Sequence, residues 1–309
     1  MSPLEWSCDA AMKGHARFCL AATAIALLAG CASIDFDYPR LESTAVIDTE
    51  DTYLGSRATQ LSFARPPGES GFYPLPDGID ALTARLLLAE RAERTIDTQY
   101  YLIKNDTTGL AFIDALLRAA DRGVRVRLIV DDVFTKGYDP GMAALDSHPN
   151  FEIRVFNPFN RGAAGKVWSG VTDLRRVNLR MHTKTFTVDN QVTIVGGRNI
   201  ADEYFGARED AKFGDLDVVG IGPVARDVSR MFDSFWNHET ALPVPAFAKM
   251  PEDPAGELER VRTQLKTSRQ RIRDTKYAEA VIETALAFMA EESSSFTWAP
   301  YQLVYDSPD

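Results

Sequence analysis

The chain has 309 residues, of which 45% are hydrophobic and 25% are charged, and its formal net charge is -10. This composition is that of an ordinary globular protein, and the length suits one large domain or two smaller ones. The acidic balance disfavours a general nucleic-acid binder, because phosphate contacts dominate the affinity of such proteins, although a local basic cleft could still serve one.

Residues 1–30 have the pattern of a targeting segment. A short basic stretch precedes the apolar run FCLAATAIALLAG, which is too short for a comfortable transmembrane helix. Leu28-Ala29-Gly30-Cys31 resembles a bacterial lipobox, which implies cleavage before Cys31 and lipidation of that residue. The alternative is the start of a buried helix. Ala32 is not the aspartate that commonly retains such proteins at the inner membrane, so we expect a lipid-anchored, periplasm-facing protein of the bacterial envelope, with the outer membrane favoured.

The cysteines agree with this interpretation. They are Cys8, Cys19 and Cys31, and cleavage before the last would remove the other two. The mature chain could then form neither a disulfide nor a cysteine metal cluster. The stretch before Met12 is unusual ahead of such a signal, so Met12 is an alternative start to Met1.

The remaining chain divides into three segments. Residues 31–76 are polar and rich in turns, which predicts a tether and entry segment. Residues 77–245 predict an α/β layered domain with a mixed or parallel sheet flanked by helices, because strand and helix patterns alternate. Residues 246–309 predict linker helices and the start of a further segment. The expected elements of the domain are, in chain order, a helix at 79–94, a strand at 94–104, a helix at 107–122, a strand at 124–130, a short helix at 140–147, a strand at 151–157, a hairpin at 181–195, a strand at 215–221 and a helix at 224–238.

The run RMHTKTFTVDNQVTIVGGRNIADEYF concentrates residues suited to attack on a phosphate ester. MHTKTFTV is rich in β-branched and apolar residues, which predicts a strand with His182 and Lys184 on one face. Asp189-Asn190 is typical of a turn, and QVTIV returns as a second strand. Gly196 and Gly197 have no Cβ, so backbone could approach a ligand closely there, and Asn199 offers an amide donor.

The spacing H-x-K-x4-D-x6-G-G-x-N resembles the HKD signature of the phospholipase D superfamily. RTIDTQYYLI, GVRVRLIVDD, GDLDVVGIGPV and MFDSFWNHE resemble the matching segments of bacterial cardiolipin synthases, over about Asp80 to Glu239. The lipobox together with GGRNIADEYF resembles the cardiolipin synthase C type of lipoprotein.

This resemblance implies a mechanism. His182 would attack the phosphorus of an anionic phospholipid at a membrane surface and form a phosphohistidine. Lys184 and Asn199 would hold the phosphoryl oxygens beside Gly196 and Gly197. Asp189 would belong to the catalytic set, with a mainly structural or orienting role in fixing the hairpin or a neighbouring histidine. An alcohol such as the glycerol of phosphatidylglycerol would then accept the phosphatidyl group, and water would give hydrolysis. The family implies no metal or other cofactor, and we expect no nucleic acid partner.

Enzymes of this kind carry two HKD motifs, and the second histidine protonates the leaving alcohol. The histidines of this chain are His15, His148, His182 and His238, and His182 alone begins an H-x-K. We therefore expect the N-terminal half of a longer enzyme, whose second histidine comes from a missing C-terminal half or from a homodimer. The strand expected near the C-terminus would have no sheet to join and would leave an unpaired edge. The alternatives are a hydrolase or nuclease of the same superfamily and an inactive lipid-anchored fragment.

Two basic stretches keep two interpretations each. The first could steer an anionic head group or be a solvated loop, and it comprises Arg161, Lys166, Arg175, Arg176, Arg180 and Lys184. The second, Thr263 to Arg273, could lie on an anionic membrane as an amphipathic helix or be a solvated linker helix.

Overall fold

The computed structural model describes residues 34–135, 137–161, 179–208, 213–273, 275–290 and 295–308. The expected signal segment 1–30, Cys31, and Lys166, Arg175 and Arg176 of the first basic stretch lie outside these ranges.

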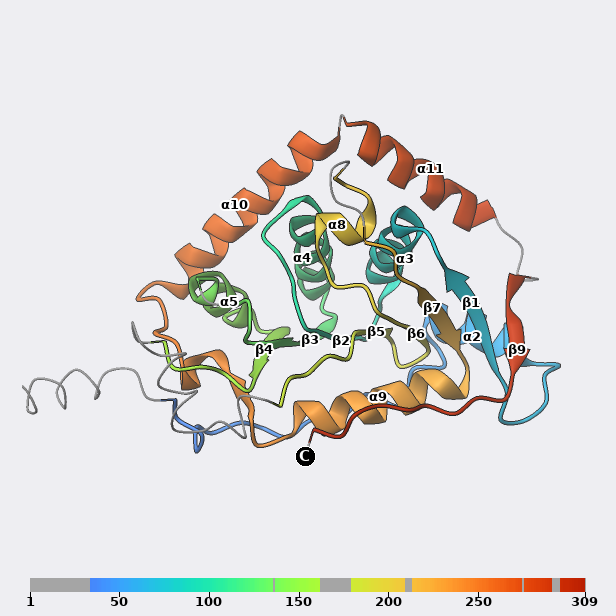
Figure 1. The fold of residues 1–309 in the computed structure, drawn as a ribbon, viewed down its shortest axis with the longest axis horizontal. Helices are drawn as coiled ribbons and strands as arrows, with labels where there is room; N and C mark the ends of the chain where they lie inside the picture. Colours follow the sequence, from blue (N-terminus) through green and yellow to red (C-terminus); the bar gives the residue numbers. More distant parts are fainter. Residues whose placement is uncertain are drawn as a thin grey trace, which may run out of the picture.

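One mixed β-sheet organises the described residues (Figure 1). Its strand order is β8-β4-β3-β2-β5-β6-β7-β1-β9, in which β2, β3 and β4 run parallel and the other neighbours are antiparallel. The α/β prediction is confirmed. The strands are β1 (Ser70–Leu75), β2 (Thr95–Tyr100), β3 (Arg125–Asp131), β4 (Phe151–Phe156), β5 (Thr185–Val188), β6 (Val192–Gly196), β7 (Asp217–Ile221), β8 (Ala241–Pro243) and β9 (Thr297–Ala299).

Helices cover both faces of this sheet. In Figure 1, α3, α4 and α5 lie on one face with α10 and α11 outside them, and α9 lies on the other. The helices are α2 (Tyr53–Ser62), α3 (Gly78–Arg91), α4 (Thr107–Asp121), α5 (Asp139–Asp146), α8 (Asp202–Phe205), α9 (Pro223–Trp236), α10 (Pro254–Arg273) and α11 (Lys276–Ala290), with a 3-10 turn at Val244–Ala246.

The helix that precedes β3 begins and ends where its sequence predicts. The Asp106 side chain accepts a hydrogen bond from the Gly109 amide at 3.0 Å, which caps the first turn of α4. Gly123 has φ of 96°, a left-handed conformation that ends a helix at little cost only for glycine. This start and stop fix where β3 begins, and therefore where its carboxyl end lies.

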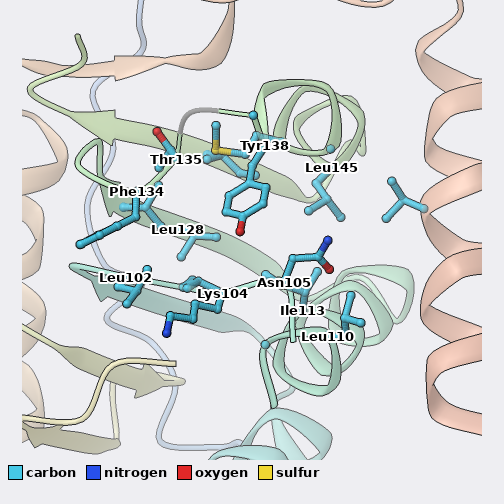
Figure 2. Close-up of a pocket in the computed structure, with 18 of the residues that line it drawn as sticks. Leu102, Lys104, Asn105, Leu110, Ile113, Leu128, Phe134, Thr135, Tyr138 and Leu145 are labelled. Atoms are coloured by element: carbon cyan, nitrogen blue, oxygen red, sulfur yellow. The ribbon is translucent and has the colours of Figure 1, made fainter. Parts of the chain in front are cut away.

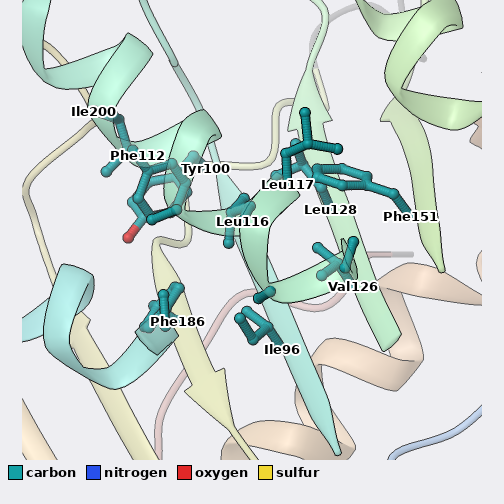
Figure 3. Close-up of a cluster of buried hydrophobic side chains, with 14 of the residues drawn as sticks. Ile96, Tyr100, Phe112, Leu116, Leu117, Val126, Leu128, Phe151, Phe186 and Ile200 are labelled. Atoms are coloured by element: carbon teal, nitrogen blue, oxygen red, sulfur yellow. The ribbon is translucent and has the colours of Figure 1, made fainter. Parts of the chain in front are cut away.

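Burial on both faces makes the central strands rigid. Val126 and Leu128 of β3 belong to the cluster under α4, together with Leu116 and Phe112 (Figure 3), whereas Ile129 belongs to the cluster under α9. Alternation along the strand thus places apolar side chains in two cores.

A buried arginine joins the sheet to α9. Arg127 of β3 is 1% exposed and binds both carboxylate oxygens of Asp97 at 2.7 and 2.8 Å. It also donates to Asp233 of α9 at 2.8 Å. A charge this deep is tolerated only when paired and hydrogen-bonded, so this network specifies how α9 docks.

The segment expected to be a tether is largely part of the domain. Within residues 34–76, β1 lies inside the sheet between β7 and β9. The strip before α2 is held by long-range hydrogen bonds, from Arg127 to the Ser43 carbonyl and from the Ala45 amide to Asp233. The turn-rich composition of this segment did not predict its place in the domain, because the groups that hold it lie far away in the sequence.

The C-terminal region also differs from expectation. The expected unpaired strand, β9, forms antiparallel pairs with β1, from Ser70–Ala299 to Phe72–Thr297, so the prediction of no partner sheet was wrong. The helices α10 and α11 pack on α4, α5 and α3 rather than standing apart as a linker. In the part of the chain that the structure describes, no helix has the length and apolar character needed to cross a membrane.

Candidate functional site

The candidate residues gather at one edge of the sheet. The parallel strands β2, β3 and β4 all end there, and ligands of α/β proteins commonly bind outside such carboxyl ends. Strand β5 pairs antiparallel with β2, with Thr185 opposite Gln99 and Val188 opposite Ile96. The residues just before β5 therefore lie beside the end of β2.

His182 and Lys184 lie side by side at this edge, as the sequence predicted. Lys184 Nζ is 3.0 Å from His182 Nδ1, and it also donates to the His182 carbonyl. Both residues precede β5 instead of lying within a strand, because the regular pairing begins at Thr185. His182 is exposed, whereas Lys184 is only 5% exposed. The pair thus combines a reachable imidazole with a half-desolvated ammonium group.

This environment adjusts both pKa values. Burial, and then the positive charge of Lys184, lower the pKa of His182 below its ordinary value of 6.5, while Asp306 opposes them. Burial lowers the pKa of Lys184 to about 8, against the opposing charges of Asp215 and Asp131. Between these two values the imidazole is neutral and the ammonium is charged, which are the forms a nucleophile and an anion-binding cation require.

A carboxylate at the end of β3 holds the chain that leads to His182. Asp131 accepts hydrogen bonds from the Met181 amide and from Arg180 Nη1, both at 3.0 Å. Burial raises the pKa of Asp131 to about 6. Asn157, which has φ of 51°, adds a bond from its side chain to the Leu179 carbonyl at 2.7 Å. The three residues before His182 are thereby fixed to the carboxyl ends of two parallel strands.

An aromatic wall borders the pair. The Tyr101 ring lies 4.9 Å from the His182 ring, and Lys184 Nζ lies 5.6 Å from the Tyr101 ring centroid. Phe134 meets Tyr101 edge-on at 5.7 Å and is 49% exposed. Cation–π contact favours the charged form of Lys184 on this side.

The two glycines make room for carboxylates. A Cβ on Gly196 would lie 2.0 Å from Asp217 Oδ1, and one on Gly197 would lie 2.2 Å from Asp215 Oδ1. The close neighbours of both glycines in the structure are therefore carboxylates on the β7 side of the sheet, and contact of the glycines with a ligand stays a prediction. The glycines thus bring Asp215 to the same edge as Lys184.

Asn199 is a better candidate for contact with a ligand. It is 5% exposed, and its Nδ2 lies 3.2 Å from the Tyr204 hydroxyl. Its Oδ1 has no hydrogen-bond partner among the described residues. A buried amide oxygen that accepts no hydrogen bond lowers the stability of the fold unless a ligand or another group pairs with it. Contact of Asn199 with a ligand therefore stays a prediction.

Asp189 lies at the other end of β5 and does not join the catalytic pair. Its carboxylate accepts hydrogen bonds from the amides of Glu93, Arg94 and Thr95, at 3.1, 2.8 and 2.9 Å to the nearer oxygen. The Gln191 amide bonds to the Val188 carbonyl, closing a turn in which Asp189 and Asn190 both have positive φ. These contacts agree with the expected role of fixing the hairpin, because the side chain joins the hairpin to the start of β2. They correct only the placement of Asp189 among the catalytic residues.

The described part of the first basic stretch is neutralised locally. Arg161 pairs with Asp132 at 2.6 Å and with Asp139 at 2.9 Å, and Arg180 pairs with Asp131. These two arginines hold loops in place, which leaves Lys184 as the candidate for anion binding within this part of the stretch.

Sequence reasoning missed Asp131 and Tyr101. Both lie where a parallel strand ends, and Asp131-Asp132 directly after a buried strand was the available signal. Across the ranges described above, no group of three or more His, Cys, Asp or Glu side chains could hold a metal ion.

Comparison with known proteins gives a consistent result. Residues 87–236 match the family model described as cardiolipin synthase, PLD-like domain. Over 186 residues the chain is 49% identical to cardiolipin synthase C of Escherichia coli, covering 60% of this chain and 39% of that protein. It is 35% identical over 218 residues to an uncharacterized protein of Helicobacter pylori, covering 70% and 43%. The chain thus spans about two fifths of the length of these relatives.

Among solved structures, phosphatidylserine synthase of Haemophilus influenzae aligns with a TM-score of 0.46 at 14% identity. The alignment covers 71% of this chain and 48% of that one.

The structural role of Asp189 yields a prediction. Asp189→Ala removes an acceptor shared by three backbone amides, so we expect the free energy of unfolding in urea to fall by about 2–4 kcal/mol. Because Asp189 does not touch His182, the His182 pKa measured by NMR titration of the folded variant should not change. Asp189→Asn retains one acceptor oxygen and should lose less stability. A shifted His182 pKa in Asp189→Ala would return Asp189 to the catalytic set.

Proposed function

We propose that this chain, which has a PLD-like domain over residues 87–236, transfers phosphatidyl groups between phospholipids, as in cardiolipin synthesis, through a phosphohistidine on His182. The observation that carries this proposal is the His182–Lys184 pair, 3.0 Å apart at an open edge of the sheet. The donor would be an anionic phospholipid at a membrane surface, such as phosphatidylglycerol.

The resting contact between the two side chains defines the first step. While Lys184 donates to Nδ1, the imidazole proton is on Nε2 and the ring lone pair is occupied. A phosphodiester offers Lys184 anionic oxygens, which are stronger acceptors than a neutral ring nitrogen. When the substrate binds, Lys184 therefore transfers its hydrogen bond from the imidazole ring to the phosphate. This transfer frees the imidazole for attack.

The covalent step then follows from charge and geometry. A nitrogen of His182 forms a bond to phosphorus as the bond to the leaving alkoxide breaks, while Lys184 and Asn199 stabilise the charge on the phosphoryl oxygens. A second alcohol displaces the histidine and gives the product diester. Water in its place gives phosphatidate.

The histidine itself provides the decisive test. Purified chain would be incubated with phosphatidylglycerol, and cardiolipin and phosphatidate would be quantified by mass spectrometry. His182→Ala should abolish both products, because it removes the nucleophile. It should also abolish the phosphohistidine that forms with phosphorus-labelled lipid and is trapped by rapid denaturation in detergent at alkaline pH. His148→Ala, at a buried histidine that pairs with Asp121, is the matched control and should keep activity.

The products separate the alternatives. Phosphatidate without cardiolipin would indicate a hydrolase, and cleavage of added DNA would indicate a nuclease. Full turnover by His182→Ala would exclude the proposed nucleophile. Absence of every product and of the trapped intermediate in the wild-type chain would indicate an inactive protein.

The two shifted pKa values predict the pH dependence. The rate should rise with pH as His182 loses its proton, at a pKa below 6.5, and fall as Lys184 loses its charge near pH 8. A plot of kcat/KM against pH, which reports the free enzyme, should therefore be bell-shaped. A rate that stays constant through pH 8 would contradict the role of Lys184 as a cation.

The leaving alkoxide requires a proton, and we propose that a second HKD histidine donates it. In this chain alone, the donor would be His182 of a second copy in a two-fold dimer whose sites face each other. General acid catalysis contributes ~10²–10⁴-fold. Specific activity should then rise with protein concentration over the range in which sedimentation detects a dimer. Activity that is independent of concentration in a strictly monomeric sample would contradict this arrangement.

A further inference from the structure

A cavity of about 300 Å³ lies between the sheet and α10, on the α4 and α5 side (Figure 2). This volume is at the lower end of the range of ligand pockets, ~300–1,000 Å³. Neither His182 nor Lys184 lines it.

Apolar side chains from four elements form the interior of the cavity. In Figure 2, Leu128 of β3, Leu110 and Ile113 of α4 and Leu145 of α5 surround one space. Val261 and Leu265 of α10 contribute to the outer wall. Polar residues, among them Lys104, Asn105 and Thr135, come from the loops that follow β2 and β3. The lining of the cavity is therefore mostly apolar, and its polar residues come from the loops at the edge where the strands end; Figure 2 shows Asn105 and the Tyr138 ring within the same space.

The edge of the cavity at these loops is shared with the catalytic pair. Tyr101 lines the cavity, and its ring also lies 4.9 Å from the ring of His182. Phe134 lines the cavity and contacts the other side of Tyr101. Asp131, which fixes the residues before His182, lines it as well. A phosphate at His182 would thus place one of its ester substituents beside the cavity entrance.

We propose that the cavity binds an acyl chain of the phospholipid whose phosphate is held by His182 and Lys184, an inference that rests on the proposed function. A hydrocarbon chain matches the mostly apolar lining, whereas a sugar or nucleotide would leave most of its hydrogen-bonding groups unpaired there. At close packing the volume accommodates roughly ten methylene groups. The cavity thereby contributes binding energy remote from phosphorus and orients the diester against the imidazole.

Gly141 of α5 allows the cavity to be filled with little disturbance. It lines the cavity, and a Cβ added there would have no heavy atom within 4 Å. Gly141→Phe should place its ring in the open space, and Val261→Phe should do so from α10. Gln270→Phe, on the exposed face of α10, is the matched control because it adds the same ring outside the cavity.

The direct test measures binding of a medium-chain fatty acid that carries a dansyl group, with the full chain and fluorescence as the readout. Wild type and Gln270→Phe should bind the probe equally. Gly141→Phe and Val261→Phe should bind it at least about tenfold more weakly, because about two excluded methylene groups already account for that factor. Equal binding by all four proteins, or none by the wild type, would overturn the proposal.

A transfer assay separates this proposal from the proposed function. With long-chain phosphatidylglycerol as donor, the two filled variants should lose about tenfold in kcat/KM, and with a short-chain donor they should approach the wild type. If the wild type transfers phosphatidyl groups and the filled variants do so equally well with both donors, the acyl site is overturned and the proposed function stands. Weaker probe binding by the filled variants, together with no transfer by any protein, would keep the acyl site and overturn the proposed function.

Discussion

The antiparallel pairing of β5 with β2 is the constraint on which the site depends. At one end of β5, Asp189 binds three amides at the start of β2. At the other end, the pairing of Thr185 with Gln99 leaves Lys184 and His182 beside the last residues of β2. A slip of one residue would turn every side chain of β5 to the opposite face, so anchoring one end of the strand sets the position of the proposed nucleophile at the other.

Burial and charge act together to make the pair chemically useful. A fully solvated lysine would hold its proton far above neutral pH, and a solvated histidine would be partly protonated. Here Lys184 is covered by Tyr101 and neighbouring strands, while His182 remains accessible. The carboxylates of Asp131 and Asp215 limit the drop in the Lys184 pKa, so a cation and a neutral imidazole coexist near pH 7. Asp131 contributes twice, because it also fixes the backbone before His182.

The sequence predicted what depends on local spacing. The caps of α4, the hairpin turn at Asp189-Asn190 and the shared location of His182 and Lys184 all follow from neighbouring residues. The sequence did not predict contacts between residues that are distant along the chain. The glycines at 196 and 197 were assigned to a ligand because nothing local reveals that Asp217 and Asp215 lie against them. The pairing of β9 with β1 joins residues more than two hundred positions apart, beyond any periodicity argument.

The packing of α10 connects the outer layer with the site and limits how this helix could meet a membrane. Its apolar side, including Val261 and Leu265, faces the core and the cavity. Two of its arginines, Arg262 and Arg269, pair with carboxylates of α4. An interfacial helix binds lipid by burying its apolar face, and in α10 that face is already covered. Any contact of α10 with a bilayer would therefore be electrostatic, and its apolar residues serve the interior, where they wall the space beside the catalytic edge.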